Sequence, residues 1–357
     1  MTMKFNSENL LFEDDNDSTS KALDERQAVQ AILPLENLGE QRIERRSKNE
    51  KLALSSANIY MDKATIRDAD YIHSVLCQVG LPRKQPFQLN EEGGKILDEK
   101  GNPILAREFE RRSGNSSLLI KAGECWDGLN WVKQPLPYGT IPRLSLVYII
   151  SEALRKKDPV INIGETLTDF MLSIGVSKSG GKYGRYDYVK KQIRALSVCE
   201  LKLGVSSAMD ARSITINPIS EFRAWLSDSN AQKVLWPGEI TLSKQFFDSI
   251  ITHSVPLDKR ALRELGDSAL ALDIYFWLAH RLHRSKRDGE LIRWPALRSQ
   301  FGQEYKNLFH FKEEFSQKLR QALTQYVTAK VKIDNSQGII IYESPSPVPK
   351  KIDFSGK

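Results

Sequence analysis

Two short stretches of the sequence have spacings that could support chemistry on a phosphate or with a metal. The segment GVSKSG, residues 175–180, has the Gly-x4-Gly spacing of a phosphate-binding loop. However, Gly181 stands where such a loop needs Lys, and Lys182 stands where it needs Ser or Thr. His280 and His283 are three residues apart, without a third ligand or a His-x-Glu pattern near them. The sequence therefore predicts neither a nucleotide loop nor a metal site, and no cofactor.

Tyrosines and histidines raise a third chemistry, the nicking of DNA by a nucleophilic tyrosine beside a metal held by a histidine cluster. The five histidines are His73, His253, His280, His283 and His310, and no two of them flank a single hydrophobic residue as that cluster requires. The three cysteines, Cys77, Cys125 and Cys199, form no CxxC spacing and no disulfide framework. We expect a protein that is not an enzyme, and a rolling-circle nicking enzyme stays as the alternative from another functional class.

The stretch KYGRYDYVKKQIRAL, residues 182–196, places three tyrosines and five basic side chains on one short segment. The chain of 357 residues carries 52 basic and 45 acidic side chains, a net charge of +7. This modest excess by itself favours a polyanionic partner only weakly. The longest apolar run, ALALDIYFWLAH, is too short to span a bilayer, and the N-terminal segment has no signal-peptide pattern. We expect a cytoplasmic protein with no membrane partner.

Residues after 136 have the element order of a winged helix-turn-helix. A helix beginning near Pro142, a short strand at PVINI and a helix ending at Gly175 come first. A polar turn, a third helix to Cys199 and two strands, ELKLGV and RSITINP, follow. The second and third helices are predicted to form the helix-turn-helix, and the last two strands the wing.

The same order returns about 130 residues further along the chain, at the level of elements rather than of residue identity. A mostly apolar helix, SALALDIYFWLAHRLHR, precedes a strand at ELIRW, a helix at PALRSQFG, a long helix from Phe309 and two strands. The sequence thus predicts an α+β fold of tandem winged helix-turn-helix domains with a small N-terminal β-containing region. The predicted parts are a disordered and charged helical arm (1–60), a small α/β region (61–135), the first winged-helix domain (136–226), a linker strand and helices (227–265), the second winged-helix domain (266–344) and a disordered tail (345–357).

The third helix of each copy carries the candidate DNA contacts. A helical wheel turns Tyr186, Val189, Ile193 and Leu196 inward in the first copy, and Phe311, Phe315, Leu319, Ala322 and Tyr326 inward in the second. The outward residues and the flanking basic residues form the predicted DNA-binding set: Lys178, Lys182, Arg185, Tyr188, Lys191 and Arg194, then Arg287, Arg298, Lys306, His310, Gln317, Arg320, Gln321, Thr324 and Lys332. We expect the first copy to contact phosphates and the second to read bases, because Gln, Arg and Thr bond to base edges. The alternative is that both outer faces are simply solvated.

Several long phrases resemble the plasmid-encoded RepA replication initiator family. They are LPYGTIPRLSLVYIISEAL, TLTDFMLSIGVSKSGGKYG, FFDSIITHSVPLDKRAL and SALALDIYFWLAHRLH, and the resemblance covers roughly residues 70–340. It implies a protein that binds repeated double-stranded DNA sequences at a plasmid origin, helps to open the duplex and recruits host replication proteins such as the initiator and the helicase. It also implies repression of its own promoter, often by a homodimer. A transcriptional repressor or a partition factor of the same fold is the nearest alternative.

Overall fold

The computed structural model describes residues 47–126, 129–164, 166–176, 185–206, 211–216, 219–226 and 235–349. The predicted disordered segment at residues 1–20 lies outside these ranges, as do residues 350–357 of the predicted disordered tail. The first part of that tail is ordered, which corrects the prediction for residues 345–349. Val348 is fully buried, and the Tyr326 hydroxyl donates to the Pro345 carbonyl at 2.6 Å.

The second half of the chain forms the predicted winged helix. It consists of α9 (Ala269–Arg281), β12 (Glu290–Arg293), α10 (Trp294–Phe301), α11 (Leu308–Gln325), β13 (Val331–Asp334) and β14 (Gly338–Ile341). The strands pair antiparallel in the order β12-β14-β13, so the β13–β14 hairpin is the wing. Trp294 packs edge-on against Phe311 and Phe315, with ring centroids 6.4 and 6.1 Å apart. The residues predicted to face inward from α11 are all buried, which confirms that part of the prediction.

The first winged helix contains α4 (Thr140–Lys156), β6 (Val160–Asn162), α5 (Leu167–Ser173) and α6 (Arg185–Val198), again in the predicted order. Its wing differs from the prediction. Strand β6 pairs with β10 (Leu235–Leu242), and β10 pairs with β9 (Ile219–Leu226), giving the order β6-β10-β9. The wing is therefore the β9–β10 hairpin, and β10 falls within the stretch predicted as a linker.

The strands predicted as the first wing belong to a different sheet. They are β7 (Glu200–Ser206) and β8 (Ala211–Ile216), and they extend the hairpin of β2 (Glu108–Ser113) and β3 (Ser116–Lys121) into a four-stranded sheet ordered β2-β3-β7-β8. The alternation that made them look like a wing instead places Leu201 and Leu203 opposite Ile120 and Leu118 of β3, and these four side chains are buried. The β2–β3 and β7–β8 hairpins are each amphipathic, so this pattern alone does not show which other strand each of them pairs with.

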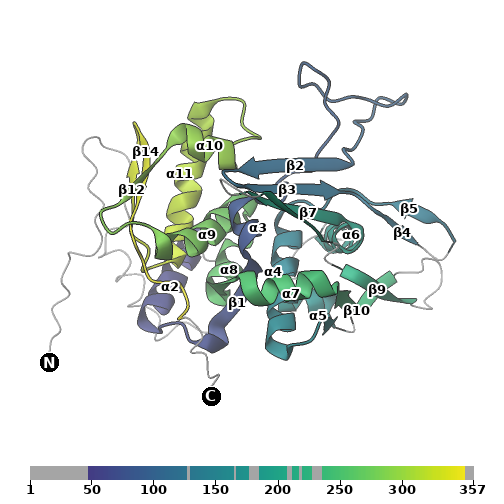
Figure 1. Cartoon of the computed structure of the whole chain (residues 1–357), viewed down its shortest axis with the longest axis horizontal. Helices are drawn as coiled ribbons and strands as arrows, with labels where there is room; N and C mark the ends of the chain where they lie inside the picture. The colour runs from purple at the N-terminus through teal and green to yellow at the C-terminus, as the bar shows by residue number, and fades with distance from the viewer. Residues whose placement is uncertain are drawn as a thin grey trace.

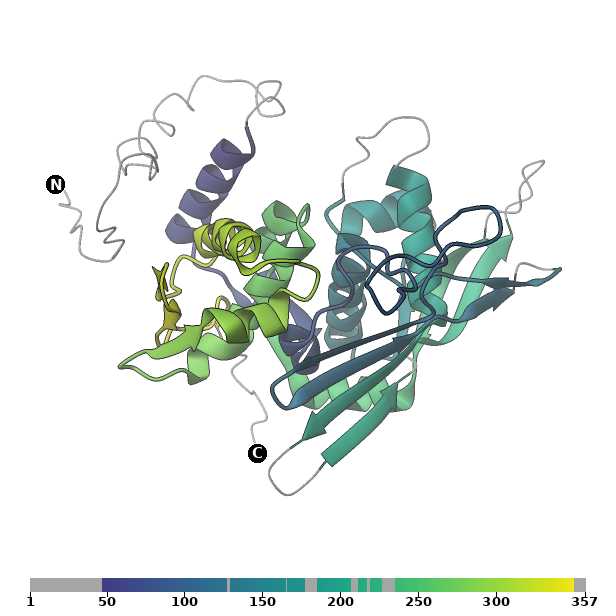
Figure 2. The same ribbon diagram turned by 90° about the horizontal axis from the view of Figure 1, so that it is seen from above.

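The remaining elements connect these parts (Figure 1). They are α2 (Lys48–Met61), η4 (Ile66–Asp68), β1 (Ala69–His73), α3 (Ser74–Gln78), the β4 (Glu124–Trp126) and β5 (Trp131–Lys133) hairpin, α7 (Lys244–His253), β11 (Ser254–Asp258), α8 (Lys259–Leu265) and η5 (Leu282–Arg284). Strand β1 pairs antiparallel with β11. One hydrophobic core runs through both winged helices. Figure 2 shows the second winged helix with α2 at one end and the first winged helix with the large sheet at the other.

Candidate nucleic-acid interface

The outer face of α11 is an open, polar surface of the second winged helix. Asn307 caps the helix, because its side-chain oxygen accepts the His310 backbone N–H at 2.9 Å. His310, Gln317 and Arg320, which were predicted to contact DNA, are all exposed on this face. Glu313 is exposed beside them, with its carboxylate 4.0 Å from the His310 ring. The face therefore offers both donors and acceptors to a ligand.

The C-terminal part of the predicted reading face is less open. Gln321 and Thr324 are half-buried, and the Thr324 hydroxyl donates to the Gln321 carbonyl at 2.7 Å inside the helix. Helix α2 flanks this end of α11, where the buried Gln325 amide accepts from Ser55 at 2.8 Å and donates to the Leu52 carbonyl at 2.9 Å. The open stretch of α11 consequently lies between residues 309 and 320.

The wing turn lies next to the N-terminal half of α11. Lys312 donates to the Asn335 carbonyl at 3.4 Å, and its ammonium lies 5.4 Å from the centroid of the Trp294 ring. The indole N–H of Trp294 donates to the Asp334 carbonyl at 3.0 Å. These contacts hold the wing turn beside the N-terminal half of α11, and Lys332 on β13 of the same wing is exposed.

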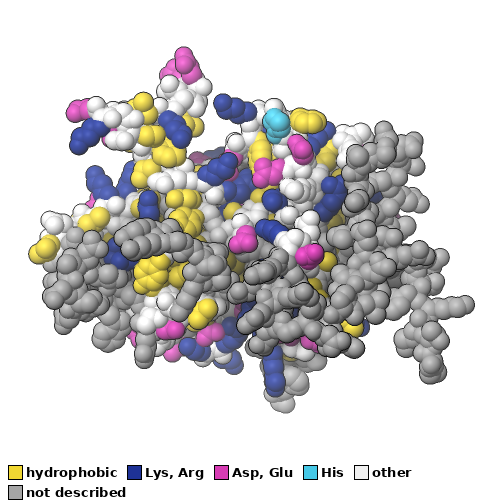
Figure 3. Space-filling model, turned by 180° about the vertical axis from the view of Figure 1, so that it is seen from behind, with side chains coloured by type: hydrophobic (Ala, Val, Ile, Leu, Met, Phe, Trp, Pro, Cys, Tyr) yellow, Lys and Arg dark blue, Asp and Glu magenta, His cyan; other side chains and the backbone are white. Residues whose placement is uncertain are grey.

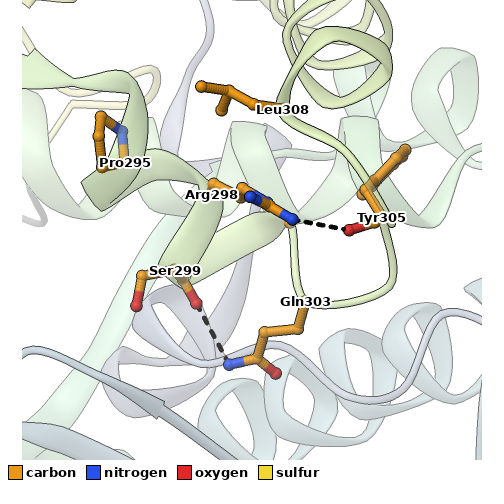
Figure 4. A pocket seen from close by; sticks show the side chains of 7 residues that line it. Pro295, Arg298, Ser299, Gln303, Tyr305 and Leu308 are labelled. Atoms are coloured by element: carbon orange, nitrogen blue, oxygen red, sulfur yellow. Dashed lines mark hydrogen bonds between the residues drawn. The ribbon is translucent and has the colours of Figure 1, made fainter. Parts of the chain in front are cut away.

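The turn between α10 and α11 holds a shallow hollow of about 420 Å³ (Figure 4). Arg298 lines it, and its guanidinium donates to the Tyr305 carbonyl at 3.2 Å and to the Lys306 carbonyl at 3.1 Å. Gln303 reaches back to the Ser299 carbonyl at 3.2 Å. Arg298 thus shapes the turn that presents α11, and the neighbouring Lys306 side chain is exposed.

Arg287 precedes β12 and lies next to Glu343, which follows β14 of the wing. Its guanidinium donates to the Glu343 carboxylate at 2.8 Å, and 88% of its side chain is exposed. An exposed pair of this kind contributes little to stability, so Arg287 can exchange its partner at small cost. Among the described residues on the face seen from behind, Lys and Arg side chains lie between Asp and Glu side chains and do not merge into one continuous basic patch (Figure 3).

Helix α6 of the first winged helix presents a different set of residues from the one predicted. Val189, Ile193 and Leu196 are buried as expected, but the two tyrosines are exchanged. Tyr186, predicted to be in the core, is 48% exposed, and Tyr188, predicted to face outward, is half-buried. The helical wheel assumed that other elements cover only one side of α6. In the structure, the segment around Tyr138 that leads into α4 covers a second side.

Tyr188 is held by that segment. Its hydroxyl donates to the Tyr138 carbonyl at 3.1 Å, and the two rings meet edge to face at 5.8 Å. Burial raises the pKa of Tyr188 to about 12. Gln192 is also buried there and accepts the Tyr138 backbone N–H at 2.8 Å. A side chain at Gly139, where φ is +82°, would begin 2.2 Å from the Tyr188 hydroxyl, so the close approach requires glycine.

Besides Tyr188, the predicted contacts of the first winged helix that the structure places are Lys191 and Arg194. Lys191 is exposed, and Arg194 is half-buried, with its Nε atom buried and without a hydrogen-bond partner among the described residues. Burial, followed by the charge of Arg194, lowers the pKa of the neighbouring Lys190. Lys178 and Lys182 lie outside the described residues, as does the side chain of Arg185, which begins α6.

A buried polar junction joins the two winged helices, and sequence reasoning missed it. Arg143 of α4 makes a two-pronged ion pair with Asp273 of α9, at 2.7 and 2.8 Å, and both side chains are almost fully buried. The same guanidinium donates to the carbonyls of Leu81, Pro82 and Gly139 at 2.6, 3.1 and 2.6 Å. The signal in the sequence was Asp273 itself, a carboxylate inside an otherwise apolar helix.

A second part of this junction reaches the turn before α11. Arg111 of β2, with a side chain only 2% exposed, donates to Gln303 and to Glu304, each at 3.1 Å. Burial and then the charge of Arg83 lower the pKa of Arg111 to about 10. Burial alone would raise the pKa of Glu304, but the charges of Arg83 and Arg111 outweigh it and the pKa is lowered. The pair therefore stays ionised and ties the helix-turn-helix to the large sheet.

Within the described ranges, no group of three or more His, Cys, Asp or Glu side chains could hold a metal ion. His280 lies next to the Arg284 guanidinium, and burial, followed by that charge, lowers the pKa of His280 to about 4. No described helix is long and apolar enough to cross a bilayer. The phosphate-loop spacing at residues 175–180 lies mostly outside the described part of the chain.

Residues 136–295 match the family model of the plasmid-encoded RepA protein, a span that begins before α4 and ends at the start of α10. The crystal structure of domains 2 and 3 of RctB is similar in fold; the match covers 77% of this chain and 99% of the RctB chain, with 11% sequence identity and a TM-score of 0.47. Another crystal structure of RctB domains 2–3 covers 75% of this chain and 94% of that chain, with 12% identity and a TM-score of 0.41. No curated protein sequence matches the chain.

Proposed function

We propose that the chain is a replication initiator of the plasmid-encoded RepA family, whose model matches residues 136–295, and that it binds repeated sequences at a plasmid origin. Bound to several adjacent repeats, it promotes opening of the neighbouring duplex and recruits host replication proteins such as the initiator and the helicase. A homodimer binding the promoter of its own gene would give autorepression.

One observation carries the DNA-binding part of the proposal. The outer face of α11 is open, polar and flanked by a wing, while its inner face is fully packed. A helix of this kind fits the major groove, which is wide enough to admit an α-helix. The exposed Gln317 and Arg320 can bond to base edges, and Lys306 and Lys332 lie on either side of them in the chain for contact with phosphates.

The first winged helix supports a second contact on the same DNA. Helix α6 presents the exposed Lys191 and the half-buried Lys190, although Tyr188 is committed to packing. We propose that these two lysines contact the DNA backbone while α11 reads bases. The binding energy then comes from counterion release at the phosphates together with hydrogen bonds in one groove.

The decisive experiment is a footprint of the purified chain on plasmid DNA that carries its gene and the adjacent direct repeats. Protection of the repeats, together with loss of plasmid maintenance when α11 carries Arg320→Ala, supports an initiator. Protection of the promoter alone, with maintenance unaffected, would instead favour a transcriptional repressor. Nicked circles from supercoiled origin DNA and Mg²⁺ would favour a nicking enzyme.

A further inference from the structure

An aromatic ring stands exposed on the reading face of α11. Phe309, the second residue of the helix, is 72% exposed, whereas Phe311 and Phe315 on the same helix are fully buried. Its nearest ring neighbour is His310, with centroids 5.7 Å apart. Nothing in the packing of the second winged helix requires a phenylalanine at this position.

The surroundings of Phe309 are polar. His310 and Glu313 are exposed on the helix beside it, and Asn307 precedes it as the cap. A protein-docking surface usually presents a continuous apolar patch, and a single ring between charged and amide groups is not one. The ring instead lies in line with Glu313 and Arg320 along the helix, at the end that the wing flanks.

Only one apolar group is exposed on the base-pair edges of the major groove, the C5 methyl group of thymine, and apolar side chains such as Phe recognise it. We propose that Phe309 contacts a thymine methyl group in the repeat and so specifies an A·T pair opposite the first turn of α11. This inference rests on the proposed function, because it assumes that α11 enters the groove. It adds an apolar contact to a face whose other members are hydrogen-bonding groups.

The test compares two proteins on two kinds of DNA. The wild-type chain and Phe309→Ala are titrated against the footprinted repeat and against copies in which each thymidine is replaced, one at a time, by deoxyuridine, which removes only the methyl group. Burying one methyl group corresponds to about a 3- to 5-fold change in the dissociation constant. We expect the wild type to lose that factor at one or two positions, and Phe309→Ala to bind the repeat more weakly but to be indifferent to the same replacements.

Matched controls separate this inference from the function on which it rests. Ile251→Ala removes another exposed apolar side chain, 57% exposed on α7, and should change neither affinity nor methyl dependence. If the wild type fails to protect any repeat, the proposed function is wrong. If it protects the repeat but tolerates loss of every methyl group, or if Phe309→Ala keeps the wild-type methyl dependence, the role of Phe309 is wrong and the function stands.

Discussion

Replacing Asp273 by Asn should destabilise the chain far more than the loss of an exposed carboxylate. Asp273 is 5% exposed and receives both prongs of the Arg143 guanidinium. The variant keeps the volume of the side chain, so no cavity forms. It removes the charge that compensates a buried guanidinium, and the new NH₂ group meets the donors of Arg143. Gly80 makes the space tight, since a side chain there would begin 2.7 Å from the Asp273 carboxylate.

The magnitude follows from what each variant leaves unpaired. Removing one partner of a buried ion pair costs about 3–5 kcal/mol, and Asp273→Asn should be near the lower end because one carbonyl acceptor remains. Arg143→Met should cost more. It leaves the Asp273 carboxylate alone and also removes one donor from three backbone carbonyls. The Pro82 carbonyl still accepts the Gly139 N–H at 3.0 Å and the Leu81 carbonyl still accepts from Arg111 at 3.4 Å, so the uncompensated carboxylate is the larger part of the cost.

Urea unfolding followed by circular dichroism measures both changes, with the slope of each transition compared with that of the wild type. Asp267→Asn is the matched control, because its carboxylate is 67% exposed and lies 4.0 Å from Lys48. We expect it to cost less than about 1 kcal/mol. An Asp273→Asn variant as stable as Asp267→Asn, or an Arg143→Met variant more stable than Asp273→Asn, would refute the account of the junction.

Three further predictions concern α11, α6 and a buried histidine. Arg320→Ala should weaken binding to the repeat by about 1–3 kcal/mol and relax the preference at one base pair, which a binding assay on single-base variants detects. Lys191→Ala should weaken binding to every sequence alike and reduce the slope of log affinity against log salt by about one; a base-specific loss would contradict this. Burial, and then the nearby His253, lower the pKa of His73 to about 4, so His73 stays neutral in the fold while the unfolded chain takes up a proton near pH 6.5. The stability that it contributes is complete above pH 6.5 and is lost as the pH falls towards 4, by about 3 kcal/mol; unfolding of His73→Gln should show a flatter dependence over that range.

Element order was the part of the fold that could be read from the sequence. Helices α10 and α11 each have an apolar stripe, which in α11 includes Phe311, Phe315 and Leu319, and Gly302 ends α10. Local periodicity and capping are enough to locate such elements. The strands β13 and β14 are neighbours in sequence and pair with each other, so this wing was predicted correctly.

Strand pairing over long distances was the part that could not be read. Strands β7 and β8 are as suitable for a wing as β9 and β10, and β-propensity does not choose between partners. The choice was made by β3, nearly 80 residues earlier, whose Ser116 pairs with Val205. The exchange of Tyr186 and Tyr188 has the same origin, because the segment around Tyr138 that covers α6 comes from outside the helix-turn-helix.

The candidate site divides in a similar way. The outward direction of His310, Gln317 and Arg320 follows from a wheel, because the inner stripe of α11 is unambiguous. The half-burial of Thr324 could not be predicted from the wheel. It results from the packing of α2 against this end of α11, and nothing in the sequence of α2 shows that it packs there. Phe309 also lies outside the inner stripe, but it is not basic and cannot form hydrogen bonds through its side chain, so it was not in the predicted DNA-binding set.

The junction has a consequence for DNA that contacts both winged helices. One link between the two winged helices passes through the four-stranded sheet. Arg111 on β2 donates to Gln303 and Glu304 in the turn before α11. Strand β2 pairs with β3, β3 pairs with β7, and β7 directly follows α6 of the first winged helix. The Arg143–Asp273 pair forms a second link between α4 and α9. Separating the two winged helices would expose part of the hydrophobic core that runs through both of them, at about 2.5 kcal/mol per 100 Å² of apolar surface, and would break the buried Arg143–Asp273 pair. Smooth bending of a site of 20–30 base pairs costs about 1–6 kcal/mol. If both proposed contacts fall on one DNA molecule with a spacing that does not match straight DNA, we expect the duplex to bend and the protein to keep its shape, because bending the duplex costs less.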